Sequence, residues 1–260
     1  MVKSINKREM IHEGIFIICC SAISLALGYY TALTVLPLLL LTLVFRIPSR
    51  EAIAIPSCKT LALAFLIPYL LILLQGIMTA LKVYKSLDIS ADNIKIAVKI
   101  LALAFSLVLI KLSGFSLSKF NWSVTRKQLF FTLAVGSIIA VAFLLLDGSK
   151  FAGKFNYSIP DYFLYILRIT VLTAFFEELL CRGVLLSWLK GIGLSESKAN
   201  MLQAFIFGVV HMFNYLGSGV IIAFLITSSH ILIGYFFGKL YLKTKTLIPG
   251  IIIHIIWDII

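Results

Sequence analysis

The segment FLYILRITVLTAFFEELLCRGVLLSWL, residues 163–189, is long and apolar enough to cross a bilayer, yet two adjacent carboxylates, Glu177 and Glu178, and Arg182 lie deep within it. Ionisable side chains at such depth are rare, because hydrocarbon penalises them. They usually face the interior of a helix bundle or a water-filled cavity. Glu177, Glu178 and Arg182 therefore predict a transmembrane helix whose polar face is covered by neighbouring helices.

The composition places the whole chain in the same class. Hydrophobic residues make up 61% and charged residues 13% of the 260, and the mean hydropathy is +1.06. A soluble domain could not cover this much apolar surface, so we expect an all-α polytopic transmembrane helix bundle. The net charge of +12 comes from cations between the apolar runs. This pattern predicts loops that face an anionic cytosolic leaflet. We therefore expect the lipid bilayer to be a partner and expect no binding of nucleic acid.

The apolar runs predict eight or nine helices. The first run, 15–45, is about 31 residues long and is interrupted by Gly28 and Pro37. One strongly tilted helix needs about 20–25 residues, so a hairpin of two short helices is the competing interpretation. The other runs lie at about 60–82, 97–115, 128–146, 163–189, 200–216, 219–240 and 246–260. The loop charges favour the hairpin and nine spans with a cytosolic N-terminus, in a multi-pass protein of the cell membrane.

The polar residues within the predicted spans divide the chain in two. All of those that we expect to face inward follow residue 170: Glu177, Glu178, Arg182, His211, His230, His254 and Asp258. The longest polar interruption in the second half is the predicted loop 147–162. We therefore expect variable N-terminal transmembrane helices over residues 1–146 and a catalytic transmembrane core over residues 160–260.

Helix geometry distinguishes the two glutamates. Glu178 and Arg182 are one turn apart on one helix face, the spacing at which a carboxylate and a guanidinium can pair. Glu177 points about 100° away from Glu178, so the same arginine is not expected to neutralise both. Glu177 is thus predicted to lack this ion pair and to be free for a functional role. Counted along their helices, Glu177, His211 and His254 reach similar depths and could meet.

Three motifs in this order resemble those of the CPBP, or ABI, family of CAAX-processing and bacteriocin-processing endopeptidases, which includes the type II CAAX prenyl endopeptidases. EELLCR at 177–182 is similar to the family's EExxxR, FGVVH at 207–211 to FxxxH, and HIIWD at 254–258 to HxxxN/D. The resemblance covers about residues 160–260, and the first half only as a generic multi-span region. It implies a hydrolase, an intramembrane protease of the CAAX type.

The resemblance implies a role for each matching residue. Glu177 is expected to be the general base that activates water, and His211 to hold the same water. Glu178 and Arg182 are expected to be the supporting pair that orients Glu177.

The third motif implies the remaining two roles. His254 is expected to stabilise the tetrahedral oxyanion. Asp258 stands at a position where the prenyl endopeptidases use asparagine, and an ionised aspartate cannot donate to an oxyanion. It is instead expected to accept from His254, one turn away, or to be protonated itself.

The expected reaction is hydrolysis of a peptide bond by activated water, in a membrane-embedded or lipid-anchored peptide or protein substrate, with no cofactor required. A zinc-dependent version is the alternative, because Glu177, His211 and His254 could form a three-ligand site with an open position. The spacing lacks HExxH, which favours the metal-free version. A transporter, for which buried Glu, His and Arg are equally natural, and a non-catalytic immunity or scaffold protein are the rival functions.

Overall fold

The computed structural model describes residues 7–26, 31–44, 59–87, 90–152 and 158–259, and these residues are helical with short connections and no strand. The first half comprises α1 (Lys7–Ala26), α2 (Thr31–Val44), α3 (Lys59–Ala80), η1 (Val83–Leu87), α4 (Ala91–Leu112), η2 (Leu117–Lys119) and α5 (Arg126–Ala152). The second half comprises α6 (Ile159–Arg168), η4 (Ile169–Phe175), α7 (Phe176–Glu178), η5 (Leu179–Leu186), α8 (Ser187–Gly191), α9 (Glu196–Met212), η6 (Phe213–Ser218), α10 (Val220–Thr244) and α11 (Ile248–Ile259).

The described residues form nine helical segments when the continuous helix 159–191 is taken as one, which confirms the all-α fold and agrees with the expected eight or nine helices. The first apolar run is a hairpin of α1 and α2, although its turn at 27–30 lies outside the described residues. Five helices, α1, α3, α4, α5 and α10, are long and apolar enough to cross a membrane. The chain is thus a multi-pass membrane protein.

Helices suit this sequence because the bilayer offers no hydrogen-bond partner to the backbone, and a helix satisfies its own N–H and C=O groups. Pro37 and Pro68 lie inside α2 and α3, as transmembrane helices tolerate. Serine hydroxyls cap several N-termini; Ser90, for example, accepts a hydrogen bond from the backbone N–H of Asn93.

Two predicted boundaries are wrong. Helix α4 begins at Ala91 rather than near 97, because Ser90 caps it there, so Lys95 lies within the helix and not in an outer loop. Helix α5 continues to Ala152, which shortens the predicted loop 147–162 to the connection before α6. Most of that connection, 153–157, lies outside the described residues.

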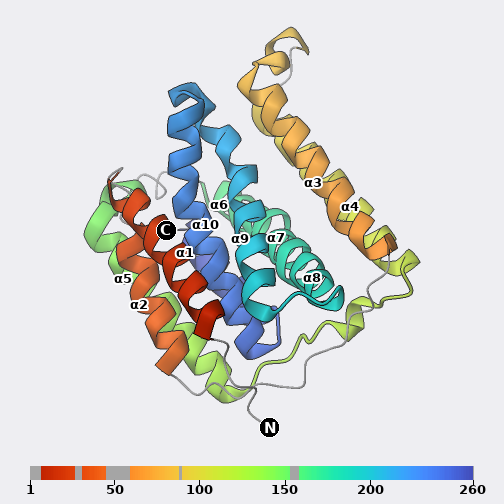
Figure 1. The fold of residues 1–260 in the computed structure, drawn as a ribbon. Helices are drawn as coiled ribbons and strands as arrows, with labels where there is room; N and C mark the ends of the chain where they lie inside the picture. The colour runs from red at the N-terminus through yellow and green to blue at the C-terminus, as the bar shows by residue number, and fades with distance from the viewer. Residues whose placement is uncertain (1–6, 27–30, 45–58, 88–89, 153–157, 260) are drawn as a thin grey trace.

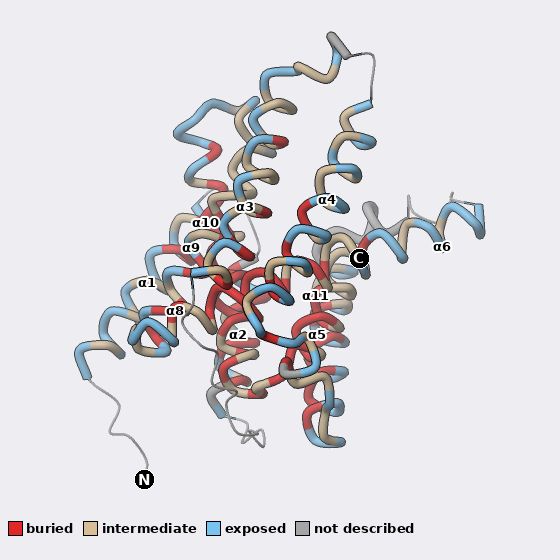
Figure 2. Tube along the Cα trace, turned by 90° about the vertical axis from the view of Figure 1, so that its right-hand side faces the viewer, coloured by how far each residue is buried: buried red, intermediate tan, exposed pale blue. Residues whose placement is uncertain are grey.

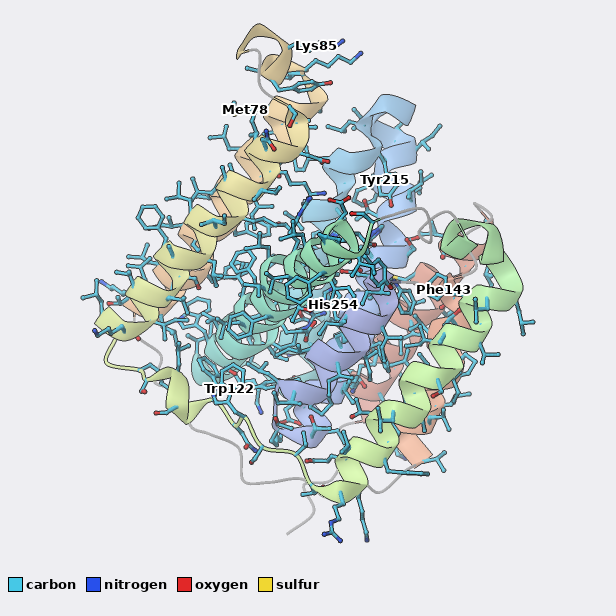
Figure 3. All side chains as sticks on the ribbon, turned by 180° about the vertical axis from the view of Figure 1, so that it is seen from behind. Met78, Lys85, Trp122, Phe143, Tyr215 and His254 are labelled. Carbon is cyan, nitrogen blue, oxygen red and sulfur yellow. The ribbon has the colours of Figure 1, made fainter. Side chains whose placement is uncertain are left out.

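The helices are arranged in three groups (Figures 1 and 3). Helices α3 and α4 lie side by side along one flank, and α1, α2 and α5 lie on the other flank. The helices α6–α11 stand between them. Buried positions are concentrated in this middle group and where α2 and α5 pack against it, whereas α6 projects outward and has no buried residue (Figure 2).

Helices α9 and α10 have the most extensive contact in the molecule. Their close approach depends on a small residue at Gly234, where an added Cβ would lie 2.9 Å from Phe207 and 3.2 Å from the Cα of Ala204. Small residues at helix interfaces are common in membranes, because there packing and backbone contacts drive association. The approach also turns the Gly234 carbonyl toward the polar centre described below.

The helix that carries the two glutamates is not a uniform α-helix. Residues Ile169–Phe175 and Leu179–Leu186 are π-helical and flank the short α-helical turn Phe176–Glu178. π-helical turns are rare and occur frequently at functional sites. The wider turns therefore occur directly on either side of the carboxylates that the sequence predicts to be functional.

Candidate active site

Glu178 and Arg182 form the predicted ion pair. The Arg182 Nη1 lies 3.0 Å from the Glu178 Oε1, one helical turn away, and the two residues are 0% and 1% exposed. The same Oε1 lies 3.1 Å from Nδ1 of His254 on α11. The pair therefore contacts His254, whereas the sequence led us to expect that it would orient Glu177.

Arg182 has further partners that hold it in the interior. Its Nη2 donates to the Gly234 carbonyl at 3.1 Å, and its guanidinium carbon lies 4.6 Å and 5.2 Å from the ring centroids of Phe207 and Phe237. A guanidinium over aromatic faces is attracted by the ring quadrupole. Arg182 thus links the glutamate-bearing helix to α9 and α10.

Glu177 is paired, which corrects the prediction that it is left without a cation. The Lys99 Nζ, on α4, lies 3.0 Å from the Glu177 Oε1 and also donates to the Thr173 Oγ1 at 3.2 Å. The side chains of Lys99 and Glu177 are 12% and 14% exposed. The prediction that all inward-facing ionisable residues follow residue 170 is therefore wrong for Lys99.

The second oxygen of Glu177 has a different environment. Its Oε2 is buried and has no hydrogen-bond partner among the described residues. The His254 Nε2 lies 3.8 Å from this oxygen, which is beyond hydrogen-bond length. Glu177 thus has one oxygen held by lysine and one oxygen that is unsatisfied by protein.

The ring of His211, on α9, has a defined orientation. Its Nδ1 lies 2.8 Å from the Phe207 carbonyl. Because a carbonyl only accepts, we assign the proton of the neutral ring to Nδ1, which leaves Nε2 as an acceptor. The ring stacks on His230 of α10 with centroids 4.6 Å apart.

His254 lies near the centre of the bundle (Figure 3), between three carboxylates. Besides Glu178 and Glu177, the Asp258 Oδ2 lies 3.7 Å from the His254 Nε2, one turn along α11. That separation is longer than the hydrogen bond that the sequence led us to expect from His254 to Asp258. Carboxylates on several sides favour the protonated imidazole.

A cavity of about 630 Å³ opens beside these residues. Glu177, His211, Lys99 and Asp258 line it, whereas Glu178, Arg182 and His254 are not among its lining residues. The remaining lining includes apolar side chains from α3, α4, η4 and α9 and the polar Gln75, Thr79, Lys95, Tyr165, Arg168 and Thr173. The arrangement thus has an inner layer of buried charges and an outer layer that meets the cavity.

The zinc set that the sequence offered as an alternative is not assembled among the described residues. Among the described residues, no group of three or more His, Cys, Asp or Glu is arranged to hold a metal ion, and this includes the zinc set Glu177, His211 and His254. The Nδ1 atoms of both histidines have protein partners, the Phe207 carbonyl and the Glu178 carboxylate, and this arrangement is also common in histidines that bind a metal through Nε2. The metal-free hydrolysis is proposed below, and a chelator tests the zinc-dependent alternative.

Sequence reasoning missed Lys99, Thr173 and the Gly234 carbonyl. A signal for Lys99 was present, because it is an isolated lysine inside the predicted run 97–115. Its partner is 78 positions away, so no spacing rule could identify it. A backbone carbonyl such as that of Gly234 leaves no mark in the sequence.

The fold and the site define a polytopic helical membrane protein with a buried cluster of charges beside an internal cavity. Residues 159–260 match the family model described as "Type II CAAX prenyl endopeptidase Rce1-like". This segment is thus similar to the Rce1-like endopeptidase domain, which agrees with the resemblance of its motifs to the CPBP family. Comparison with curated proteins gave no match, and comparison with solved structures also gave none.

Proposed function

We propose that the protein is an intramembrane endopeptidase that hydrolyses a peptide bond of a membrane-embedded or lipid-anchored substrate with water activated by Glu177 and His211. The observation that carries this proposal is the environment of the Glu177 Oε2, a buried carboxylate oxygen without a protein hydrogen-bond partner among the described residues. It belongs to a residue that lines the same cavity as His211. The Rce1-like match over 159–260 supports the same class of reaction.

In the proposed reaction, a water molecule lies between the Glu177 Oε2 and the His211 Nε2. Glu177 takes a proton from the water while the water oxygen attacks the peptide carbonyl carbon. His211 accepts a hydrogen bond from the second hydrogen of the water. The tetrahedral intermediate collapses when the C–N bond breaks. Glu177 returns its proton to the departing amine and is regenerated. The proton that remains on the new carboxyl group then passes to the amine, so that the products are a carboxylate and an ammonium group.

The inner layer has a supporting role in this proposal. The contacts of His254 favour a function in offsetting the charge of three carboxylates, rather than the oxyanion contact that the resemblance implies, because His254 does not line the cavity. Arg182 and Glu178 fix its orientation through the 3.1 Å contact to Nδ1. Asp258 stands at the cavity side of His254 and helps to retain its proton.

The test is cleavage of a lipid-anchored or transmembrane peptide by the purified protein in detergent. Glu177→Gln, Glu177→Ala and His211→Ala should each lower the rate by about 10²–10⁴-fold, the usual contribution of general acid–base catalysis. Cleavage in H₂¹⁸O should label the new carboxyl terminus with ¹⁸O. Hydroxylamine added to the cleavage reaction should trap no acyl-enzyme, because no covalent intermediate is expected. Unchanged biological function in all three variants would instead indicate a scaffold, and inhibition by a chelator would support a metal.

A further inference from the structure

Lys99 is a charged residue inside an apolar helix whose position the reaction above does not explain. It lies about 12 Å along α4 from the start of that helix at Ala91. A lysine at such depth ordinarily extends its side chain toward the membrane surface, where the ammonium meets water. The Lys99 ammonium instead lies against Glu177 and Thr173, with its side chain only 12% exposed.

Neither Arg182 nor His254 can replace Lys99. Arg182 is committed to Glu178 at 3.0 Å and to the Gly234 carbonyl at 3.1 Å. His254 comes no closer to Glu177 than 3.8 Å, through Nε2, and it is shared with two other carboxylates. Within the described part of the chain, Lys99 is thus the cation in direct hydrogen-bond contact with Glu177.

A buried carboxylate without a charged partner tends to take up a proton and become neutral. A neutral carboxylic acid cannot accept a proton from water, so it cannot act as the base. The ammonium of Lys99 stabilises the ionised form and at the same time holds Oε1, which leaves Oε2 as the oxygen without a partner. The choice of reactive oxygen therefore follows from the position of Lys99.

We propose that Lys99 is a positioning residue of this site, which holds Oε1 of Glu177 and keeps its carboxylate ionised so that Oε2 faces the activated water. The inference rests on the endopeptidase function proposed above. It also places part of the active site on α4, outside the segment 159–260 that matches the Rce1-like model.

The experiment compares Lys99→Met, Lys99→Gln and Lys99→Arg with wild type in the cleavage assay. Lys99→Met should lower kcat by about 10²-fold, the effect expected of a misplaced reacting group, and leave KM within about threefold. Lys99→Arg keeps the charge and should recover at least about tenfold of that loss. Lys111→Met makes the same substitution in the exposed last turn of the same helix and should match wild type.

A wild-type kcat in Lys99→Met would overturn the inference, as would a loss expressed only in KM. If Lys99→Met does not fold, the decision falls to the other two variants. A higher kcat for Lys99→Arg than for Lys99→Gln supports the role of charge, and equal values overturn it.

A separate measurement distinguishes failure of this inference from failure of the proposed function. Thermal unfolding of Lys99→Met, Glu177→Gln and the double variant needs no substrate. If the pair exists, the double variant melts no lower than the less stable single variant. An inactive wild type with that coupling present refutes the endopeptidase function, whereas an active wild type without the coupling refutes only the role of Lys99.

Discussion

Replacement of Arg182 by methionine tests the buried charge cluster directly. Methionine has a similar length but removes the charge and the donors to Glu178 and to the Gly234 carbonyl. The Gly234 carbonyl keeps its hydrogen bond from the Gln203 Nε2 at 2.8 Å. The main consequence therefore falls on Glu178, which is 1% exposed and retains only His254 as a charged partner within the described residues.

The size of the effect follows from these contacts. Breaking a buried ion pair by removal of one partner typically costs about 3–5 kcal/mol, because a charge remains buried without compensation. Loss of the guanidinium from the Phe207 and Phe237 ring faces places the expected value in the upper part of that range. Most of this loss in the free energy of unfolding arises from the Glu178 carboxylate, which stays buried without its guanidinium partner. Arg182→Met combined with Glu178→Gln should therefore recover more than half of the loss.

The measurement is the free energy of unfolding of wild type, Arg182→Met and the double variant by equilibrium unfolding in mixed micelles. Glu178→Gln alone completes the cycle and gives the coupling energy between the two side chains. A loss of unfolding free energy below about 1 kcal/mol in Arg182→Met would contradict a buried ion pair, because a loss of that size is expected of a solvent-exposed pair. A double variant as unstable as Arg182→Met would show that Glu178 is not the source of the cost.

Two further predictions concern a close approach and a surface charge cluster. An added Cβ at Gly250 would lie 2.7 Å from the Glu178 Oε2, so Gly250→Ala should cost about 1–3 kcal/mol in unfolding and lower the cleavage rate, whereas Gly14→Ala, with open space around it, should do neither. Partial burial acts to raise the pKa of Glu196, but the hydrogen bonds and charges of Lys190 and Lys245 outweigh it and hold the pKa below the ordinary 4.5. Because a depressed carboxyl pKa stabilises the folded state above the ordinary value, Glu196→Gln should be less stable than wild type at neutral pH by below about 1 kcal/mol. Thermal unfolding against pH should show that difference shrinking as the pH falls below 4.5, and a constant difference would exclude the ionic explanation.

The features that the sequence predicted correctly are local. The pairing of Glu178 with Arg182 depends on a four-residue spacing within one helix, which any helical segment brings together. The hairpin in the first apolar run follows from the length of the run, since a single helix of that length exceeds the bilayer. Both depend on geometry within a few turns of the chain.

The features that it missed depend on how helices pack. The salt bridge between Lys99 and Glu177 joins α4 to a distant helix, and the direction of a lysine side chain in an apolar run cannot be read from that run. The sequence also led us to expect that the Glu178–Arg182 pair contacts Glu177, whereas it contacts His254, because the position of His254 depends on how α11 crosses the glutamate-bearing helix. Hydropathy fixes which segments cross the membrane but not how each is rotated about its axis.

The π-helical turns on both sides of the glutamates make the rotational phase of that helix a part of the site. A π-helical turn holds one residue more than the α-helical turn that it replaces, so a return of Ile169–Phe175 to ordinary α-helix with all its residues kept would rotate every following side chain by about 100° relative to α6. Glu177 would then turn away from Lys99 although both residues remained in the chain. A substitution that restored ordinary α-helix in this segment would thus act as a loss of function, with no polar residue altered.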